Sequence, residues 1–298
     1  MSCCAPDGAG RPVATVERPA AAAGALDDAN WVAVPGGAFH MGDDGPLAYP
    51  EDGESPSRLV EVSAFRIGRA PVTNEVFARF VAAARYVTDA ERLGWSFVFG
   101  GLLPDDFPPT RGVVGAPWWR QVEGASWRHP EGPQSDLDGR GDHPVVHVSW
   151  QDASACAAWA GARLPTEAEW ERAARGGTTT TFPWGEELEP GGEHRANVFQ
   201  GDFPGGDTGA DGWTGTSPVG AFPPNGFGLV DAIGNVWEWT ASTFRPGDPR
   251  RRCLKGGSYL CHDSWCRRYR PGARTGLAPD SSSGNVGFRL ATDLEVRP

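Results

Sequence analysis

Two cysteines in the C-terminal part of the chain have the spacing of a chemical site. Cys261 and Cys266 lie in the segment GGSYLCHDSWCRRYR, where four intervening residues allow a loop to bring both sulfurs to one point. Gly256 and Gly257 precede them and permit close approach of the backbone. Neighbouring arginines and His262 favour the thiolate, which is the nucleophilic and metal-binding form of cysteine. From spacing alone, the pair is a redox disulfide, a metal-binding pair or two unrelated core thiols.

The kind of metal that such a pair could bind is limited by its ligand number. Two thiolates are too few for structural zinc, which takes four ligands, but soft sulfur donors can hold Cu(I) at low coordination number. A substrate thiol could then complete the site. Elsewhere in the chain, His143 and His147 of HPVVHVSW are a candidate zinc pair. This stretch is strand-like, and a strand would hold these two residues well apart.

Two acidic segments rich in glycine could bind a hard cation through oxygen atoms. In DAIGNVWEWT, two carboxylates and two main-chain carbonyls could converge on one ion, and ANVFQGDFPGGDTGADGWTG offers an asparagine, an aspartate and two carbonyls. The alternative is that these acids form Asx turns. The candidate ligands are Asp231, Gly234, Val236 and Glu238 in the first segment, and Asn197, Val198, Asp211 and Trp213 in the second.

The composition limits both fold and function. The chain has 41 glycines and 27 prolines among 298 residues, which disfavours long helices and an open α/β sheet, and its 13 tryptophans indicate aromatic packing between loops. The net charge of −11 argues against an extended nucleic-acid-binding surface. Residues 245–274 differ, with nine basic and two acidic residues. These basic side chains either pair with acids elsewhere in the fold or form a basic rim around a substrate site.

The sequence also bears on cellular location. No stretch approaches the roughly 18 apolar residues of a membrane-spanning helix, so we expect no membrane partner. The N-terminus lacks the basic start and apolar block of an export signal. Six cysteines without such a signal indicate a reducing compartment, and we expect a cytoplasmic location. Outside the pair, Cys156 is expected in the core, Cys253 is isolated, and Cys3 and Cys4 lie in the N-terminal tail.

Caps and periodicity predict the elements that must position the candidate site. Three helices are predicted, over residues 73–85 after the cap Thr73, 149–161 after the capping box Ser149–Asp152, and 166–177 after the capping box Thr166–Glu169. Strands are predicted over 31–34, 60–68 and 143–150, irregular packed structure over 94–142, and short strands with turns over 178–298. Residues 1–30 are predicted to be a disordered tail, and residues 31–298 a single domain.

At these residues the sequence resembles the formylglycine-generating enzymes, sulfatase-modifying factors that oxidise a sulfatase cysteine to Cα-formylglycine. The resemblance runs from WVAVPGGAFHMG through HPVVHVSWQDA, RLPTEAEWERAARGG, FPPNGFGL and GNVWEW to KGGSYLCHDSWC and PDSSSGNVGFRL, which is roughly residues 31 to 292. RLPTEAEWE and GNVWEW are shared with a wider superfamily that includes binding modules and iron-dependent sulfoxide synthases. GGSYLCHDSWCRRYR is the discriminating segment, because only the formylglycine-generating branch is expected to carry both cysteines there.

The resemblance implies a fold and a set of site residues. The implied fold is α+β, a sulfatase-modifying-factor variant of the C-type-lectin-like fold with little regular structure. Cys261 and Cys266 become the copper-binding catalytic pair, and the two acidic segments become two structural Ca²⁺ sites. The other implied active-site residues are Ser258, Trp237, His262 and Asn285.

The implied activity is that of a copper-dependent oxidase with O₂ as co-substrate. The substrate thiolate joins Cu(I) as a third sulfur ligand, the substrate Cβ–H bond is broken after O₂ activation, and hydrolysis of a thioaldehyde gives the aldehyde. The implied partner is an unfolded or nascent sulfatase polypeptide with a C-x-P-x-R motif, whose arginine could bind Asp105, Asp106 or Asp138. A monomer is expected. Cys4-Ala5-Pro6 begins like the substrate motif, but Gly8 replaces the arginine, so self-modification is not expected.

Two departures from the family pattern matter. Of four positions that form structural disulfides in secretory members, only Cys156 is a cysteine here, and the others are Ala174, Pro271 and Leu290, which supports a reducing compartment. Trp265 replaces the tyrosine that is usual before the second cysteine, so a hydroxyl group there is not essential. Two alternatives remain, a metal-free thiol–disulfide oxidoreductase and a lectin-like binding module, since this fold alone does not establish catalysis. The amount of copper bound per chain distinguishes the metal-free oxidoreductase from the oxidase.

Overall fold

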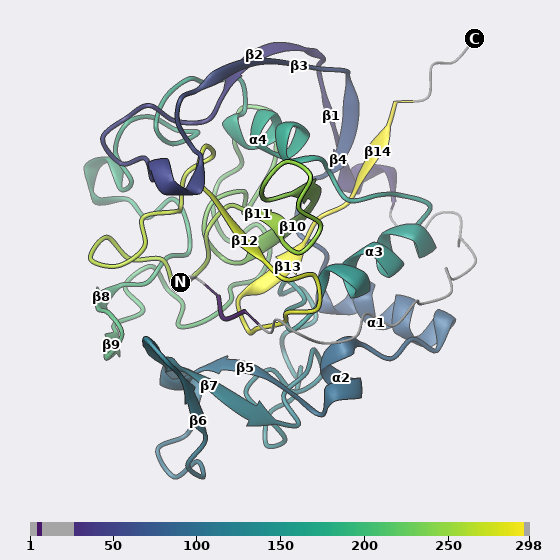
Figure 1. The fold of residues 1–298 in the computed structure, drawn as a ribbon, viewed down its shortest axis with the longest axis vertical. Coiled ribbons are helices and arrows are strands. Elements are labelled where there is room, and N and C mark those ends of the chain that lie inside the picture. Colours follow the sequence, from purple (N-terminus) through teal and green to yellow (C-terminus); the bar gives the residue numbers. More distant parts are fainter. Residues whose placement is uncertain (1–4, 8–26, 295–298) are drawn as a thin grey trace.

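Short helices and strands joined by long loops make up the part of the chain that the structure, a computed structural model, describes, namely residues 5–7 and 27–294 (Figure 1). The α-helices are α1 Asn74–Ala84, α2 Asp89–Leu93, α3 Trp150–Trp159 and α4 Glu167–Arg175, and the 3₁₀ helices are η1 Asp28–Asn30, η2 Pro50–Asp52, η3 Gly100–Leu102 and η4 Pro190–Gly192. The strands are β1 Trp31–Val34, β2 Gly37–Met41, β3 Arg58–Val62, β4 Phe65–Gly68, β5 Trp95–Phe99, β6 Arg111–Val113, β7 Ala116–Glu123, β8 Gly201–Asp202, β9 Gly206–Asp207, β10 Trp237–Thr243, β11 Arg252–Lys255, β12 Arg274–Leu277, β13 Val286–Phe288 and β14 Ala291–Asp293.

The strands form small sheets around a central one. The central sheet has the order β12-β11-β10-β13, in which β10 pairs antiparallel with β11 and parallel with β13. Figure 1 shows the β2–β3 hairpin above this sheet and the β5-β7-β6 sheet below it. A further sheet, β1-β4-β14, joins the first described strand to the last one. The central sheet matters most for the site, because β10 begins at Trp237 and β11 leads into the loop that carries the two cysteines.

The three predicted helices are confirmed, and their caps explain where they begin. The Thr73 hydroxyl accepts a hydrogen bond from the Val76 N–H at 3.4 Å at the start of α1. Ser149 and Thr166 form complete capping boxes at the starts of α3 and α4. The short helix α2 was missed, although Thr88 and Glu91 carry the same capping-box signal.

Three predictions of strands and loops are wrong, and each depended on non-local partners. The strand predicted over 60–68 is split into β3 and β4, because β3 pairs with β2 whereas β4 pairs with β1 and β14. Residues 143–149 are buried but form no strand, since their backbone bonds go to scattered partners such as Val72 and Ser283, and His147 has a φ of 59°. Trp150 already begins α3. Residues 94–142, predicted to be irregular, contain the β5-β7-β6 sheet.

The structure describes only a few residues of the predicted N-terminal tail. Ala5 and Pro6 are buried against the domain, and residues 28–30 form η1. Residues 1–4 and 8–26 lie outside the described part of the chain. The prediction of disorder is therefore untested for most of the tail.

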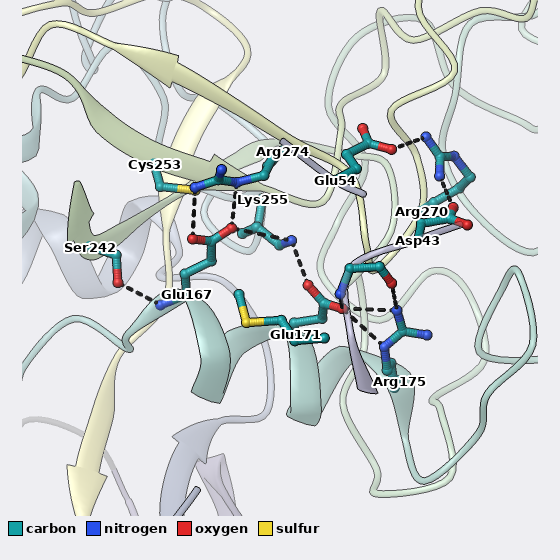
Figure 2. A network of polar contacts seen from close by, with 12 residues as sticks. Asp43, Glu54, Glu167, Glu171, Arg175, Ser242, Cys253, Lys255, Arg270 and Arg274 are labelled. Carbon is teal, nitrogen blue, oxygen red and sulfur yellow. Dashed lines mark hydrogen bonds and ion pairs between the residues drawn. The ribbon is translucent and has the colours of Figure 1, made fainter. Parts of the chain in front are cut away.

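The basic stretch 245–274 pairs with acidic residues, which confirms the first of the two alternatives. Lys255 is fully buried, and its Nζ lies 2.9 Å from the Glu171 carboxylate. Figure 2 shows this pair. Further pairs join Arg274 to Glu167 at 2.6 Å, Arg270 to Glu54 at 2.8 Å and to Asp43, and Arg268 to Asp52 at 2.6 Å. These pairs tie η2 and α4 to the segments on either side of the two cysteines.

A buried carboxylate next to α3 gives a pH-dependent prediction. Asp152 is fully buried, and it accepts hydrogen bonds from Tyr86, from the Asp89 N–H and from the Ser149 N–H. Burial and the nearby Asp89 carboxylate raise the pKa of Asp152 to about 7. The folded chain therefore holds a proton here that the unfolded chain releases between the two pKa values, so stability falls as pH rises through this window.

We expect the titration of Asp152 to lower the unfolding free energy by up to about 1.4 kcal/mol for each pH unit of increase between about pH 5 and pH 7. Urea denaturation of the wild type and of Asp152→Asn at several pH values measures this contribution to the unfolding free energy. The difference in unfolding free energy between the two chains should shift in favour of the wild type as pH falls. A difference that is constant with pH would show that Asp152 does not titrate in this range.

Within the described residues, no helix is both long enough and apolar enough to cross a membrane.

Candidate active site

The structure brings the two predicted cysteines together. Their Sγ atoms are 3.5 Å apart, and the side chains are buried, with 1% of Cys261 and 2% of Cys266 exposed. Two tight turns produce this arrangement, because the Cys261 N–H donates to the Ser258 carbonyl at 2.9 Å and the Cys266 N–H donates to the His262 carbonyl at 2.7 Å. No disulfide joins the two cysteines, so the loop presents two adjacent sulfur donors.

The glycine before this loop is required by its backbone. Gly257 has a φ of +75°, and a Cβ atom there would lie 2.9 Å from the Tyr269 Cα and 3.0 Å from the Arg268 carbonyl oxygen. Only glycine adopts this conformation in that space without strain. The close contact brings the segment that leaves the cysteine loop against the segment that enters it.

Burial controls the ionisation of the pair, and one sequence-based expectation is wrong. Burial raises the pKa of the Cys261 thiol well above its usual value, the Cys266 thiol raises it further, and the Ser258 N–H and Arg268 oppose the shift. The expected lowering by nearby cations fails because burial outweighs the opposing charge of Arg268. Cys261 therefore remains protonated unless a cation binds to it.

Three neighbouring polar groups are connected to the pair by hydrogen bonds. The Ser258 N–H donates to the Cys261 Sγ at 3.4 Å, and Arg268 donates to the Cys266 Sγ at 3.6 Å. The Asn285 amide donates to the Ser258 hydroxyl oxygen at 3.0 Å. The structure thus places Ser258 and Asn285, both predicted as site residues, within one hydrogen-bonded network at the pair.

The other two predicted lining residues have different positions. Trp237 is fully buried, and its backbone N–H donates to the Asn285 backbone carbonyl at 2.9 Å. It therefore supports the hydrogen-bonded network through the backbone of Asn285. Its indole Nε1 is buried without a hydrogen-bond partner. His262 is only partly buried, with a ring nitrogen 2.8 Å from the Ser264 hydroxyl and its ring packed on Phe199. It therefore lies at the rim rather than between the sulfurs.

An aromatic rim beside the pair was missed by sequence reasoning. Trp265 is 42% exposed, packs edge-on against Trp118 with ring centroids 4.8 Å apart, and stacks on Phe203 at 6.3 Å. Trp118 belongs to β7, in the segment predicted to be irregular. The eight-residue run APWWRQVE, rich in aromatic and β-branched residues, is the signal that could have found this strand.

The two histidines of HPVVHVSW are buried and make hydrogen bonds within the fold. His147 is fully buried, and its ring nitrogens lie 2.8 Å from the Ser96 hydroxyl and from the Pro130 carbonyl. Burial lowers its pKa to about 4. His143 bonds to the Thr216 hydroxyl at 2.9 Å. In the described residues, no three His, Cys, Asp or Glu side chains are grouped as a metal site.

The first acidic segment differs in one respect from the sequence-based expectation. Asp231 accepts a hydrogen bond from the Gly220 N–H at 2.6 Å, and burial raises its pKa to about 6. The Glu238 carboxylate, however, is held by Arg289 at 2.6 Å and by the Trp170 indole at 2.7 Å. The Glu238 carboxylate is thus already engaged by two side chains of the fold, which the sequence did not indicate.

The second acidic segment contacts the first. Asp211 accepts hydrogen bonds from the Val198 and Trp213 N–H groups, both at 3.1 Å, which gathers the predicted ligands into one loop. The Asn197 amide donates to the Gly215 carbonyl at 2.8 Å, and its own carbonyl accepts from the Asn235 N–H at 2.8 Å. The two candidate calcium segments thus meet at Asn197.

The three acids predicted as partners of a substrate arginine, Asp105, Asp106 and Asp138, all have exposed side chains. Their contacts within the described residues do not link them to the cysteine pair.

Comparison with known proteins relates the chain to one family. Residues 18–294 match the family model of the sulfatase-modifying factor enzyme 1-like domain. The formylglycine-generating enzyme of Thermomonospora curvata is 56% identical over 281 residues, covering 88% of this chain and 93% of the relative. The inactive Cα-formylglycine-generating enzyme 2 of Bos taurus is 48% identical over 269 residues, covering 88% of each.

A solved structure, PvdO of Pseudomonas aeruginosa, superposes with a TM-score of 0.64 at 26% identity, covering 89% of this chain and 94% of that one. Together with the few helices and many short strands, this match confirms the predicted α+β fold, the sulfatase-modifying-factor variant of the C-type-lectin-like fold.

Proposed function

Because this chain belongs to the family of the sulfatase-modifying factor enzyme 1-like domain, we propose that it is a formylglycine-generating enzyme. Its substrate is the cysteine of a C-x-P-x-R segment in a sulfatase polypeptide, and its product is Cα-formylglycine. The buried Cys261–Cys266 pair, with Sγ atoms 3.5 Å apart and hydrogen-bonded to Ser258 and Arg268, is the observation that carries the proposal.

The pair fits Cu(I), which we include in the proposal. Two soft thiol donors lie side by side in a buried site, and Cu(I) accepts low coordination numbers. Bound Cu(I) would supply the activation of O₂. The Cys261 and Cys266 thiols must release their protons as the metal binds, and the Arg268 guanidinium and the Ser258 N–H stabilise the resulting negative charge on sulfur.

The remaining residues position the peptide and exclude water. The network of Ser258 and Asn285 fixes the backbone next to Cys261, while the buried core cluster that contains Trp237 keeps the sulfurs away from bulk solvent. The aromatic rim of Trp265, Trp118 and Phe203 offers an apolar surface beside the pair. A cysteine inside a folded sulfatase could not reach a pair this buried, so the substrate segment must be unfolded or nascent.

The test is a turnover assay with the full chain. Oxidation of the CH₂–SH group to the aldehyde releases H₂S, and two further electrons are needed to reduce O₂ to water, so the assay contains a thiol reductant. A C-x-P-x-R peptide is incubated with copper-loaded protein and O₂, and mass analysis measures the aldehyde. Disulfide formation without copper would instead support the oxidoreductase, and peptide binding without turnover would support a binding module or an inactive relative.

Calcium binding at the two acidic segments is the second part of the proposal, and it predicts an effect on stability. The ligands lie in glycine-rich loops, which a bound cation would hold together. Calcium at about 100 times its dissociation constant should add about 2.7 kcal/mol to the unfolding free energy. We expect a chelator to lower the melting temperature and added Ca²⁺ to restore it.

Scanning calorimetry of the wild type and of Asp211→Ala measures this effect, with the exposed Asp202 replaced by alanine as the matched control. Asp211→Ala should lose part of the calcium-dependent shift and the control should keep all of it. A wild type whose melting temperature does not respond to Ca²⁺ would refute the calcium sites. The cytoplasmic location and the monomeric state expected from the sequence stay predictions.

A further inference from the structure

The N-terminal segment Ala5–Asp7 is packed into the domain, far in sequence from its partners. Ala5 is fully buried in the core cluster that also contains Cys261 and Cys266, and Pro6 is buried beside it. In Figure 1 the segment is the short purple trace next to the N-terminal label. The segment thus occupies a defined place on the domain.

The polar contacts of this segment are made by Asp7. Its Oδ1 accepts hydrogen bonds from the Ala278 N–H at 3.1 Å and from the Ser281 hydroxyl at 3.3 Å. Its Oδ2 lies 3.6 Å from the Arg251 guanidinium. The Asp7 side chain is still 32% exposed, so the segment runs from the core at Ala5 to the surface at Asp7.

The loop that Asp7 contacts continues directly into the active site. The Ser283 hydroxyl, two residues after Ser281, donates to the Asn285 side-chain oxygen at 2.8 Å. Asn285 donates in turn to Ser258, whose N–H contacts the Cys261 sulfur. One short loop, residues 278–285, therefore contacts the N-terminal segment at one end and contributes to the cysteine site at the other.

The sequence of the segment has the order of a substrate. Cys4-Ala5-Pro6 matches the first three positions of C-x-P-x-R, Asp7 stands at the variable fourth position, and Gly8 replaces the arginine. On the basis of the proposed function, we propose that Ala5–Asp7 occupies the groove that receives the residues after a substrate cysteine. The N-terminus is then an intramolecular competitor of the sulfatase peptide.

The missing arginine makes this competitor weak, and the covalent link compensates for the weakness. A tethered segment is present at an effective concentration in the millimolar range, so it occupies its groove even when its intrinsic dissociation constant is of that order. A true substrate has the additional contacts of its arginine and can displace it. The competition raises the apparent dissociation constant of the substrate peptide. The factor is one plus the ratio of the effective concentration of the tethered segment to its intrinsic dissociation constant.

The experiment measures peptide binding without turnover. A synthetic S-x-P-x-R peptide, with serine replacing the reactive cysteine, is titrated against the full chain, Asp7→Ala and a chain lacking residues 1–7. The matched control is Asp27→Ala, an exposed aspartate whose side chain makes no cap bond to the helix that follows it. We expect the truncated chain to bind about 3- to 10-fold more tightly than the full chain, Asp7→Ala to be intermediate, and the control to be unchanged.

A second measurement guards against misfolding of the truncated chain. The free peptide of residues 2–9, with both cysteines replaced by serine, should compete with the substrate peptide on the truncated chain. Equal or weaker binding of the substrate peptide after truncation, or no binding to any of the chains, would overturn the competitor role. If the competition is seen but the copper-loaded enzyme forms no aldehyde, the proposed function fails while this inference stands.

Discussion

Replacing either cysteine of the pair should abolish turnover. We expect Cys261→Ser and Cys266→Ser each to lower kcat/KM by at least about 1,000-fold, or ~4 kcal/mol of transition-state stabilisation, because a hard hydroxyl replaces one of two soft donors. The sulfurs are 3.5 Å apart in a buried site, so no other described cysteine can substitute for the one that is lost. The measurements are aldehyde formation and the copper bound per chain.

The matched control for these variants is Cys156→Ala. Cys156 is fully buried in the same core cluster, so its loss should lower stability while leaving kcat and copper binding in place. Near wild-type turnover in both serine variants would refute the site. Normal copper binding together with lost turnover would show that the pair acts in another way.

The second large effect concerns stability. Arg289 is fully buried and holds the Glu238 carboxylate, which is 1% exposed, with two hydrogen bonds of 2.6 Å. The same guanidinium donates to main-chain carbonyls of Gly68 and Val230, among others. Arg289→Ala leaves a buried carboxylate without its countercharge, and we expect a loss of at least about 3–5 kcal/mol in unfolding free energy.

Urea denaturation measures this loss, and Arg163→Ala is the surface control. Arg163 is 35% exposed and pairs with Glu169, so its removal should cost about 1 kcal/mol or less. If Arg289→Ala does not fold, the double variant Arg289→Met, Glu238→Met should recover part of the stability, because the charge and its partner leave together. A cost for Arg289→Ala no larger than for the control would refute this account.

The helices could be predicted from the sequence because their signals are local. Thr73, Ser149 and Thr166 bond within their own first turns, so a cap and a few apolar residues suffice. The strands depend on partners far away in the chain. HPVVHVSW has the composition of a strand, yet its backbone finds Val72 and Ser283 instead of a ladder.

The candidate site was predictable only in part, for the same reason. Spacing alone indicated that Cys261 and Cys266 could meet, since four residues form a tight loop. The roles of Ser258 and Asn285 came from the family resemblance, because 27 residues separate them in sequence. The direction of the thiol pKa was wrong, because burial depends on the whole fold and outweighs the charges of sequence neighbours.

The pairing of the last strands bears on how the protein is synthesised. β13 completes the central sheet on β10, β14 pairs with β4, and Asn285 and Arg289 lie in this same stretch. A nascent chain that has emerged from the ribosome only as far as residue 284 lacks the Asn285 contact to Ser258 and the countercharge of Glu238. Folding during translation can therefore form helices and hairpins, but the cysteine site is assembled only after residues 285–293 have emerged. A frameshift or premature stop within codons 285–293 should abolish activity, however much of the chain precedes it.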